Sequence, residues 1–572
     1  MWKLRPYDKA KEEQLIKSGK SKLMARLLAQ RNIETDHVDK FIASEYQNIS
    51  SPFSLAGVEK AAKVFVEAIK NKWKILSSGD YDVDGILSSV MIKELCNAVG
   101  LECQFFLPSR LEHGYGLGQK TIAALIEKMA KKNYKPDLLI VLDCGSNSYN
   151  EIEQLKQHIP HVIVIDHHLL DKTHAPNVDA LVSWHLGGTC EMCTCGEVYQ
   201  FIRGVYQLTG NKAINPIEYL TLSAIGTVAD VMPIVSDNRI IVKNGLTSYA
   251  INHVVSSGLT ALLKASNINA PVLTQMDVSF KIAPKINAAG RIDEPDIIYG
   301  LFTERDPDMA LKIANFVGTY NDERKELQKK IEGEAITQVE AAEEKFTHGI
   351  LVRDDWHVGV VGIVASKLTE KFYKPALVIG NNNGIWKGSG RSVKGVNLKA
   401  ILDMCPEIFE GYGGHEAAVG VTLKNDSLET AADVFNAACK KYYELNKISF
   451  EECNFFDAKV NAQLINPKTA EVFTDSLYPY CDENNAEPVF MLPDALIHNT
   501  SINQGKGWRL LTFHASRDID IPYPFKVFWH KFGQALEGRK ADIFFSFCQI
   551  PEKPRNQYET FELMVKDIVL KN

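Results

Sequence analysis

The chain has 572 residues, which at roughly 100–200 residues per domain is enough for about three to five domains. Its composition, 45% hydrophobic and 24% charged, is typical of a globular protein in water, and its apolar runs are too short to span a membrane. Its 11 cysteines are too sparse for a disulfide framework, so we expect a reducing, cytoplasmic setting. The net charge of −7 argues against a protein that coats DNA, but it leaves room for acids that hold cations.

The first half of the chain predicts an α/β domain. Residues 1–50 are mostly polar and are interpreted as an N-terminal extension. Over residues 51–305, helical patterns alternate with short apolar runs such as 138-LLIVL-142 and 162-VIVI-165. Continuous apolar strands separated by helices indicate a parallel sheet that is covered on both faces. We therefore expect a doubly wound, mainly parallel sheet.

Three further segments follow. Residues 306–347 form a long polar helical pattern that is interpreted as a connector. Residues 348–447 repeat the alternation of apolar runs and helices, which predicts a second α/β domain. Residues 448–572 are rich in Phe, Pro and Tyr and contain strand-like pieces, which predicts a mainly β module. Its aromatic residues would suit stacking on unpaired bases, but they would equally suit a core.

The strongest local signal is the run 79-GDYDVDG-85, in which three carboxylates alternate. Crowded carboxylates repel one another unless cations neutralise them, so a divalent metal is the natural explanation. An EF-hand loop would open in the same way, but its twelfth residue is Glu, and counting from Asp80 that position holds Met91. The EF-hand interpretation is therefore excluded.

Other acids and imidazoles follow neighbouring predicted strands. Asp143 follows one apolar run, 166-DHH-168 follows the next, and Asp230 ends an apolar helix. Because residues just past the carboxyl ends of strands meet in one crevice of an open sheet, these groups are expected to lie together with the acidic run. Oxygen and imidazole ligands favour Mn²⁺ or Mg²⁺ over a thiolate-type zinc site, so a two-metal centre is predicted.

These motifs, in their order and spacing, resemble the DHH phosphoesterase superfamily. The later runs 284-PKINAAGR-291, 388-GSGRS-392 and 413-GGHEAAVG-420 are similar to the second half of RecJ-type single-strand-specific 5′→3′ exonucleases. The resemblance covers about residues 50–440. It implies a DHH domain, a DHHA1-like domain and, more weakly, an OB-like C-terminal module.

The resemblance also implies roles for individual residues. It implies two Mn²⁺ or Mg²⁺ ions that share Asp143, with Asp82 on the first ion and Asp80 as a further candidate ligand there. The second ion would be held by Asp84, His167 and Asp230. Asp166 would orient an imidazole, and His168 would face the scissile phosphate. The position four residues before Asp82 is often a ligand His in related proteins. Here it is Ser78, which makes Asp80 the candidate substitute.

Basic, acid-free stretches lie farther along the chain, around Lys281–Arg291 and between Trp386 and Leu402. Taken alone, such stretches are more often solvated loops than binding sites. By resemblance, Arg110, Ser389 and Arg391 would hold a 5′-terminal phosphate. Contacts to the DNA backbone would come from a second set, consisting of Asn287, Arg291, Gly413, Gly414 and His415.

One cluster has no counterpart in the resemblance. The segment 185-HLGGTCEMCTC-195 brings Cys190, Cys193 and Cys195 close to His185, which would allow a structural zinc site. However, the C-x-C spacing crowds one coordination sphere, and no second CxxC completes the pattern. Reduced thiols without a metal are the favoured interpretation.

The prediction is therefore a metal-dependent single-strand-specific 5′→3′ exonuclease of DNA repair and recombination that releases 5′-mononucleotides. A phosphodiesterase for short oligonucleotides or cyclic dinucleotides would use the same metals and stays open as an alternative. So does a non-catalytic replication scaffold, although such proteins lack metal ligands that are present here. By resemblance, single-stranded DNA is the expected partner, together with a single-strand-binding protein and a helicase.

Overall fold

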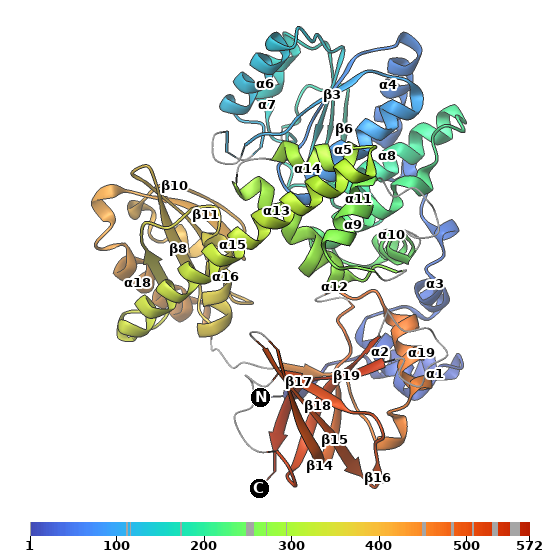
Figure 1. Cartoon of the computed structure of the whole chain (residues 1–572), viewed down its shortest axis with the longest axis vertical. Coiled ribbons are helices and arrows are strands. Elements are labelled where there is room, and N and C mark those ends of the chain that lie inside the picture. Colours follow the sequence, from blue (N-terminus) through green and yellow to red (C-terminus); the bar gives the residue numbers. More distant parts are fainter. Residues whose placement is uncertain are drawn as a thin grey trace. The chain divides into compact units, whose positions relative to one another are not determined.

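The computed structural model describes the following residues: 2–109, 113–114, 116–171, 174–247, 257–269, 272–292, 295–448, 454–481, 485–505, 508–528, 536–549 and 561–571. The chain divides into two compact units (Figure 1). The first unit comprises Met1–Asn287, Pro295–Asn315 and Glu452–Asn572, and the second comprises Ala288–Glu294 and Phe316–Glu451. Among the helices of the described residues, none has the length and hydropathy that crossing a lipid bilayer requires.

A five-stranded parallel sheet forms the centre of the first unit, in the order β3-β2-β4-β5-β6. Its strands are β2 (Ile75–Ser78), β3 (Cys103–Phe106), β4 (Leu138–Leu142), β5 (His161–Ile165) and β6 (Ala180–Val182). All five residues of β4 are buried. A strand that is buried on both faces needs apolar residues at every position, because neither face meets water. The predicted α/β doubly wound fold is confirmed.

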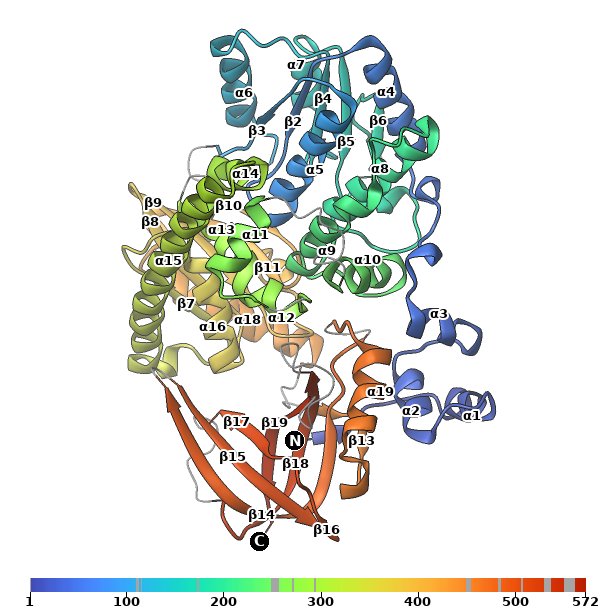
Figure 2. The same cartoon turned by 45° about the vertical axis from the view of Figure 1, so that its right-hand side comes forward.

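Helices cover both faces of this sheet, as Figure 2 shows. One face packs against α6 (Gln119–Lys131) and α7 (Tyr149–Lys156), whose apolar stripes share a core with β2, β4 and β5. The other face is covered by helices that include α4 (Val58–Asn71), α5 (Val83–Val99) and α8 (Thr194–Thr209). Helix α5 is buried along most of its length because it also packs against α9 (Leu220–Ala229). This packing brings the starts of α5 and α8 close to the end of α9.

The second unit is built on a mixed five-stranded sheet in the order β10-β11-β9-β8-β7. Its strands are β7 (Ile350–Arg353), β8 (Ala376–Asn382), β9 (Ile385–Arg391), β10 (Phe409–Gly414) and β11 (Ala418–Leu423). Only β7 and β8 pair in parallel. Helices α16 (Val361–Phe372) and α18 (Ala431–Asn446) pack against the sheet. The predicted connector is one continuous helix, α15 (Pro307–Ala341), and the boundary between the units falls within it.

The C-terminal module is a β-barrel in which β14, β18, β19, β17 and β15 pair in this order and β15 pairs again with β14. The strands are β14 (Phe490–Gly505), β15 (Trp508–Arg517), β17 (Phe525–Phe528), β18 (Lys540–Gln549) and β19 (Phe561–Leu570). Closure leaves fewer sheet edges exposed, as in OB-like barrels. The barrel interior contains the fully buried rings of Phe490, Phe513, Phe525 and Phe545. These aromatic residues therefore form a core, and they are not available for stacking on bases.

The first fifty residues are part of the same compact unit, which differs from their interpretation as an extension. Strand β1 (Trp2–Leu4) pairs in parallel with β12 (Asn454–Phe456). Helices α1 (Lys9–Lys17) and α2 (Lys22–Gln30) bury Leu15, Leu27 and Leu28 in one hydrophobic core with the barrel. The sequence shows the apolar stripe of each helix, but not that its partner lies more than 400 residues away.

A buried arginine joins three parts of the first unit. Arg239, on α10 (Ser236–Thr247), is almost fully buried. Its guanidinium donates to Ser44 Oγ and to the carbonyl of Phe41, near the end of α3 (Val38–Ala43). It also donates to four consecutive carbonyls, at 2.9–3.0 Å, at the end of α19 (Pro467–Leu477): Ser476, Leu477, Tyr478 and Pro479. A cation at a helix C-terminus is favourable because the carbonyls there carry partial negative charge.

Replacing this arginine should destabilise the protein. We expect Arg239→Met to lower the free energy of unfolding by about 3–5 kcal/mol, because several buried carbonyls lose their donor at once. Thermal or urea unfolding measures the effect. Arg305→Met is the control, because its ion pair with Glu94 is exposed, and it should change stability by less than about 1 kcal/mol. Equal, small effects of both substitutions would contradict the role assigned to Arg239.

Candidate metal centre

The acidic run lies where β2 ends and α5 begins. Asp82 caps this helix, because its Oδ1 accepts from the backbone N–H groups of Asp84 and Gly85 at 3.0 and 3.1 Å. The turn is tight: a Cβ on Gly85 would lie 2.5 Å from the backbone of Asp80. Glycine is therefore required here for the close approach of the two backbone segments. The cap and the turn place all three carboxylates at the carboxyl edge of the sheet.

Asp143 and the two histidines follow the next strands. Asp143 directly follows β4 and is buried, with φ of 62° in the left-handed region that Asp tolerates better than most residues. Its N–H donates to the carbonyl of Ile165 at 3.0 Å, which ties the ends of β4 and β5 together. His167 and His168 follow β5. Residues in the left-handed conformation, like Asp143, are found often at functional sites.

The start of helix α8 holds Asp84 in place. The backbone N–H groups of Thr194 and Cys195 donate to the two oxygens of Asp84 at 2.7 and 2.8 Å. The hydroxyl of Thr194 donates to Asp143 Oδ1 at 3.1 Å. Free N–H groups at a helix N-terminus stabilise anions. Sequence reasoning missed this contribution, because the segment was noticed only for its cysteines.

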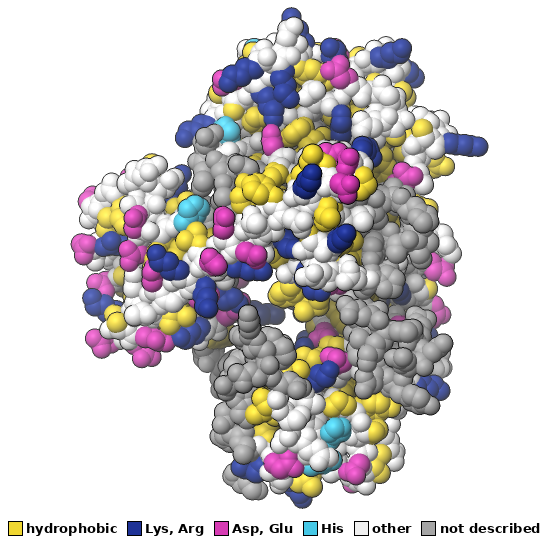
Figure 3. Space-filling model, in the orientation of Figure 1, with side chains coloured by type: hydrophobic (Ala, Val, Ile, Leu, Met, Phe, Trp, Pro, Cys, Tyr) yellow, Lys and Arg dark blue, Asp and Glu magenta, His cyan; other side chains and the backbone are white. Residues whose placement is uncertain are grey.

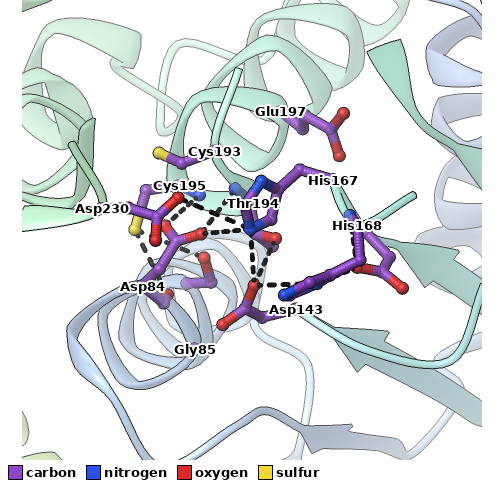
Figure 4. A network of polar contacts seen from close by, with 12 residues as sticks. Asp84, Gly85, Asp143, His167, His168, Cys193, Thr194, Cys195, Glu197 and Asp230 are labelled. Atoms are coloured by element: carbon purple, nitrogen blue, oxygen red, sulfur yellow. Dashed lines mark hydrogen bonds and ion pairs between the residues drawn. The ribbon is translucent and has the colours of Figure 1, made fainter. Parts of the chain in front are cut away.

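Figure 4 shows His167 between three carboxylates. Its Nε2 lies 3.3 Å from Asp143 Oδ1, 3.6 Å from Asp230 Oδ2 and 3.9 Å from Asp84 Oδ2. Among the described residues, three groups have potential ligand atoms within 4.8 Å of one another. These groups are Asp80/Asp82/Asp143, Asp84/His167/Asp230 and Asp143/His167/His168. The first two groups bring together residues that the resemblance assigns to the first and to the second ion.

The donor atoms fit divalent cations. Burial, together with repulsion from Asp82, Asp84 and Asp80, raises the pKa of Asp143 well above its usual range. Burial and the charge of Asp84 raise the pKa of Asp230 to about 8. Asp230 Oδ2 is buried and accepts no hydrogen bond from any described residue. A cation bound among these atoms would remove the repulsion and give this oxygen a partner, and carboxylate with imidazole suits Mn²⁺ or Mg²⁺.

Asp166 and His168 form a pair beside this centre. His168 Nδ1 lies 2.8 Å from Asp166 Oδ1, while Asp166 Oδ2 accepts from the N–H of Ser146 at 2.9 Å. Burial by itself would raise the pKa of Asp166. The hydrogen bonds from His168 and Ser146 outweigh burial and lower this pKa to about 2. Burial by itself would lower the pKa of His168, but the hydrogen bond to Asp166 raises it. The pair therefore favours a positively charged imidazole at the edge of the site.

Helix α9 ends in a Schellman motif in which Asp230 is the C-cap residue. The N–H of Val231 donates to the carbonyl of Val228 at 3.2 Å, and that of Met232 to the carbonyl of Thr227 at 3.1 Å. Val231 occupies the left-handed position of this motif, with φ of 56°, where glycine is usual. For a β-branched residue this conformation is an outlier that costs about 1–2 kcal/mol. Sequence reasoning did not single out Val231.

The second unit brings two of the predicted phosphate ligands together. On β9, Arg391 Nη1 donates to Ser389 Oγ at 2.9 Å. The first turn of α16 packs against both residues: a Cβ on Gly362 would lie 3.2 Å from Ser389 Oγ and 3.6 Å from Arg391 Nη2. A guanidinium, a hydroxyl and a helix N-terminus in contact are an arrangement that suits a phosphate.

The other predicted substrate contacts are placed less closely. Gly413 and Gly414 end β10, and the exposed His415 follows them in the turn to β11. Asn287 is half-buried on α13 (Ala283–Ile292). Arg110 lies outside the described residues, and so does the side chain of Arg291.

The three cysteines of the predicted zinc alternative do not gather around a metal. None of them belongs to the metal-binding groups of the described residues. Cys193 and Cys195 are buried in helix packing, with Cys193 Sγ 3.7 Å from Thr227 Oγ1 and Cys195 Sγ 3.4 Å from the carbonyl of Asp84. His185 instead lies 3.1 Å from the carbonyl of His167. The zinc interpretation finds no support among the described residues, because Cys193 and Cys195 contact separate groups.

Two family models match the chain: the DHH family, N-terminal domain, over residues 74–227, and the DHHA1 domain, over residues 343–441. The fold and the acid–histidine cluster thus belong to a DHH protein with a DHHA1 domain. The single-stranded-DNA-specific exonuclease RecJ of Haemophilus influenzae is 30% identical over 472 residues, which are 79% of this chain and 80% of that protein. The chain belongs to the RecJ family.

Further relatives agree with this assignment. RecJ of Bacillus subtilis is 32% identical over 413 residues, 71% of this chain, but the match spans only 51% of that longer protein. The crystal structure of RecJ in complex with Mn²⁺ from Thermus thermophilus has a TM-score of 0.79 at 23% identity and covers 99% of this chain and 79% of that chain. A structure of exonuclease RecJ bound to manganese has a TM-score of 0.59 at 27% identity and covers 70% of this chain and 99% of that chain.

The metal-free centre should make stability depend on pH. The pKa of Asp230 is about 8 in the folded protein and about 3.9 when unfolded, so the folded state binds the extra proton and is stabilised at low pH. This stabilisation is lost as pH rises through about 8. In EDTA, the melting temperature should therefore fall between pH 6 and 9, and Mg²⁺ should restore most of it.

The control for this prediction is Asp230→Asn, which cannot titrate. Its melting temperature in EDTA should change less over the same pH range, and Mg²⁺ should stabilise it less. A pH dependence identical to that of the unmodified protein would contradict the assignment to Asp230.

Proposed function

We propose that this chain is a single-strand-specific 5′→3′ DNA exonuclease that hydrolyses phosphodiester bonds to 5′-mononucleotides with two divalent metal ions. The observation that carries the proposal is the cluster at the carboxyl edge of the sheet, where two groups of potential metal ligands meet at Asp143 and His167. Membership of the RecJ family supports the choice of single-stranded DNA as the substrate.

Each ligand group has a proposed role. Asp80 and Asp82 would hold a first ion, and Asp84, His167 and Asp230 a second, with Asp143 shared between them. When bound, such a metal pair activates water and neutralises charge on the phosphate. Thr194 and the start of α8 orient Asp84 and Asp143 through hydrogen bonds. Asp166 would not bind metal, because both its oxygens accept from His168 or Ser146.

His168 would contact the phosphate that is being cleaved. Its exposed fraction is larger than that of His167, and its bond to Asp166 favours the imidazolium form. A positive charge beside the carboxylates would help to hold an anionic substrate against the acidic cluster. This role requires the tautomer and orientation that Asp166 imposes.

The second unit would bind the 5′ end of the DNA strand. Ser389, Arg391 and the first turn of α16 would bind a 5′-terminal phosphate, and His415 with Gly413 and Gly414 would contact the backbone. Arg110, Asn287 and Arg291 are proposed to contact DNA on the family resemblance alone. A site that closes on a terminal phosphate explains why hydrolysis would start at a 5′ end.

The domain assignment follows from these roles. We propose that residues 51–305 form the catalytic DHH domain, residues 348–447 the DHHA1-like domain and residues 448–572 the single-strand-binding module, with 306–347 as connector. The closed β-barrel favours a polymeric substrate over a dinucleotide. A cytoplasmic role in DNA repair and recombination, with a single-strand-binding protein and a helicase as partners, is proposed from the family.

The direct test uses an oligonucleotide labelled at either end, with Mn²⁺, beside its duplex and a dinucleotide. We expect early release of a mononucleotide from the 5′ label, gradual shortening of the 3′-labelled strand, and a spared duplex. Cleavage of the dinucleotide alone would move the protein to the small-substrate class. Cleavage of no substrate would favour the non-catalytic scaffold.

Asp143→Asn should reduce turnover by at least about 10³-fold, because the shared ligand loses its charge while Asn tolerates the left-handed backbone. Circular dichroism and the melting temperature should show an intact fold. The matched control is Asp322→Asn, an exposed residue of α15 that should keep full activity. Turnover close to that of the unmodified enzyme would refute the shared-ligand role.

Arg391→Ala should weaken the preference for a 5′-phosphorylated end. Losing a charge-assisted contact should raise KM roughly 10–100-fold on a 5′-phosphate strand and much less on a 5′-hydroxyl strand. Lys367→Ala, on α16 of the same unit, is the control. An equal loss on both strands would show that Arg391 does not read the end.

A further inference from the structure

Valine is an unexpected residue at position 231. Its backbone is in the left-handed conformation that closes the Schellman motif of α9, where glycine would carry no strain. Its side chain is 71% exposed, so burial of apolar surface does not compensate for the strain. An uncompensated strain of this kind is a feature of functional sites.

The place of Val231 in the chain links it to the candidate metal centre. It directly follows Asp230, whose Oδ2 lies 3.6 Å from His167 Nε2 in the candidate metal centre. A second exposed apolar residue has the same relation to the centre: Leu169 directly follows His168 and is 64% exposed. In Figure 4, Asp230 and His168 lie on opposite sides of His167. Two exposed apolar residues are therefore the direct chain neighbours of residues that belong to this cluster.

We infer that Val231, together with Leu169, packs against the base of a nucleotide that flanks the scissile phosphate. The inference rests on the proposed function and adds how that site recognises a single strand. A base that is out of a duplex exposes its apolar faces, and apolar side chains bind such faces without reading sequence. Metal ions held by the cluster would bind the phosphate. Val231 and Leu169, called the apolar rim below, would bind the base.

The test compares Val231→Asn and Val231→Gly with the unmodified enzyme. Asn and Gly both tolerate the left-handed backbone, so the melting temperature of each variant should stay the same or rise by about 1–3 °C. KM for single-stranded DNA should rise about fivefold, the effect of losing one partly buried apolar contact, while kcat changes little. A fall in melting temperature with unchanged KM would overturn the inference, because Val231 would then be a structural residue.

The control for relief of strain is Lys72→Gly. Lys72 closes α4 in the same left-handed conformation, with φ of 52°, but it lies just before the amino end of β2, at the edge of the sheet opposite to the acids. This variant should show a similar thermal shift with KM unchanged. A rise in KM equal to that of the Val231 variants would mean that relief of strain, not loss of the side chain, weakens binding.

Abasic substrates identify the group that Val231 contacts. Two oligonucleotides carry an abasic site on one or the other side of the first scissile bond. On one of them, KM should be equal for Val231→Asn and the unmodified enzyme, since the partner of the side chain is gone. An undiminished fivefold effect on both would overturn the inference.

Binding separates this inference from the proposed function. Kd for the same oligonucleotides, measured by fluorescence anisotropy with Ca²⁺ in place of Mn²⁺, should repeat the fivefold difference and its loss. If the unmodified chain binds in this way but cleaves nothing, the proposed function fails and the apolar rim stands. If it cleaves and the Val231 variants bind and cleave as well as it does, the rim fails alone.

Discussion

The mutual repulsion of buried carboxylates is the constraint on which the first unit depends. Asp82, Asp84, Asp143 and Asp230 meet at one edge of a sheet, where burial and their neighbours raise the pKa of three of them. The fold compensates in part, with the N-terminus of α5 at Asp82 and that of α8 at Asp84. Cations must supply the rest, so the same electrostatics that cost stability create affinity for metal.

The elements around the cluster are tightly packed, which holds the carboxylates together against their repulsion. Helices α5 and α9 are buried along most of their length, and at Gly226 a Cβ would lie 2.5 Å from Cys195 Sγ. Such packing leaves the carboxylates no room to separate. The barrel and the N-terminal helices share a core. Arg239 of α10 donates hydrogen bonds to the carbonyls of Phe41, near the end of α3, and Leu477, at the end of α19. Stability far from the cluster thus offsets the repulsion within it.

The sequence predicts the parts of the site that depend on strand ends. Asp143 and His167 follow apolar runs, so the topology of a parallel sheet is enough to bring them together. It does not predict Thr194 or the N-terminus of α8, because a helix start shows no chemistry until its neighbour is known. Val231 was missed for a similar reason: its strain lies in the backbone. The packing of α1 and α2 against the barrel depends on contacts across the whole chain.

In the proposed function, the two units would bind phosphate by different physical means. In the first unit, carboxylates would bind phosphate only through cations, so binding there would require metal and be coupled to the reaction. In the second, Arg391, Ser389 and the start of α16 carry their own positive charge and dipole and need no cation. A strand held by the second unit alone would be bound but not cleaved. If both contacts are required, hydrolysis would be restricted to strands whose 5′ end the second unit holds, which is how an exonuclease acts.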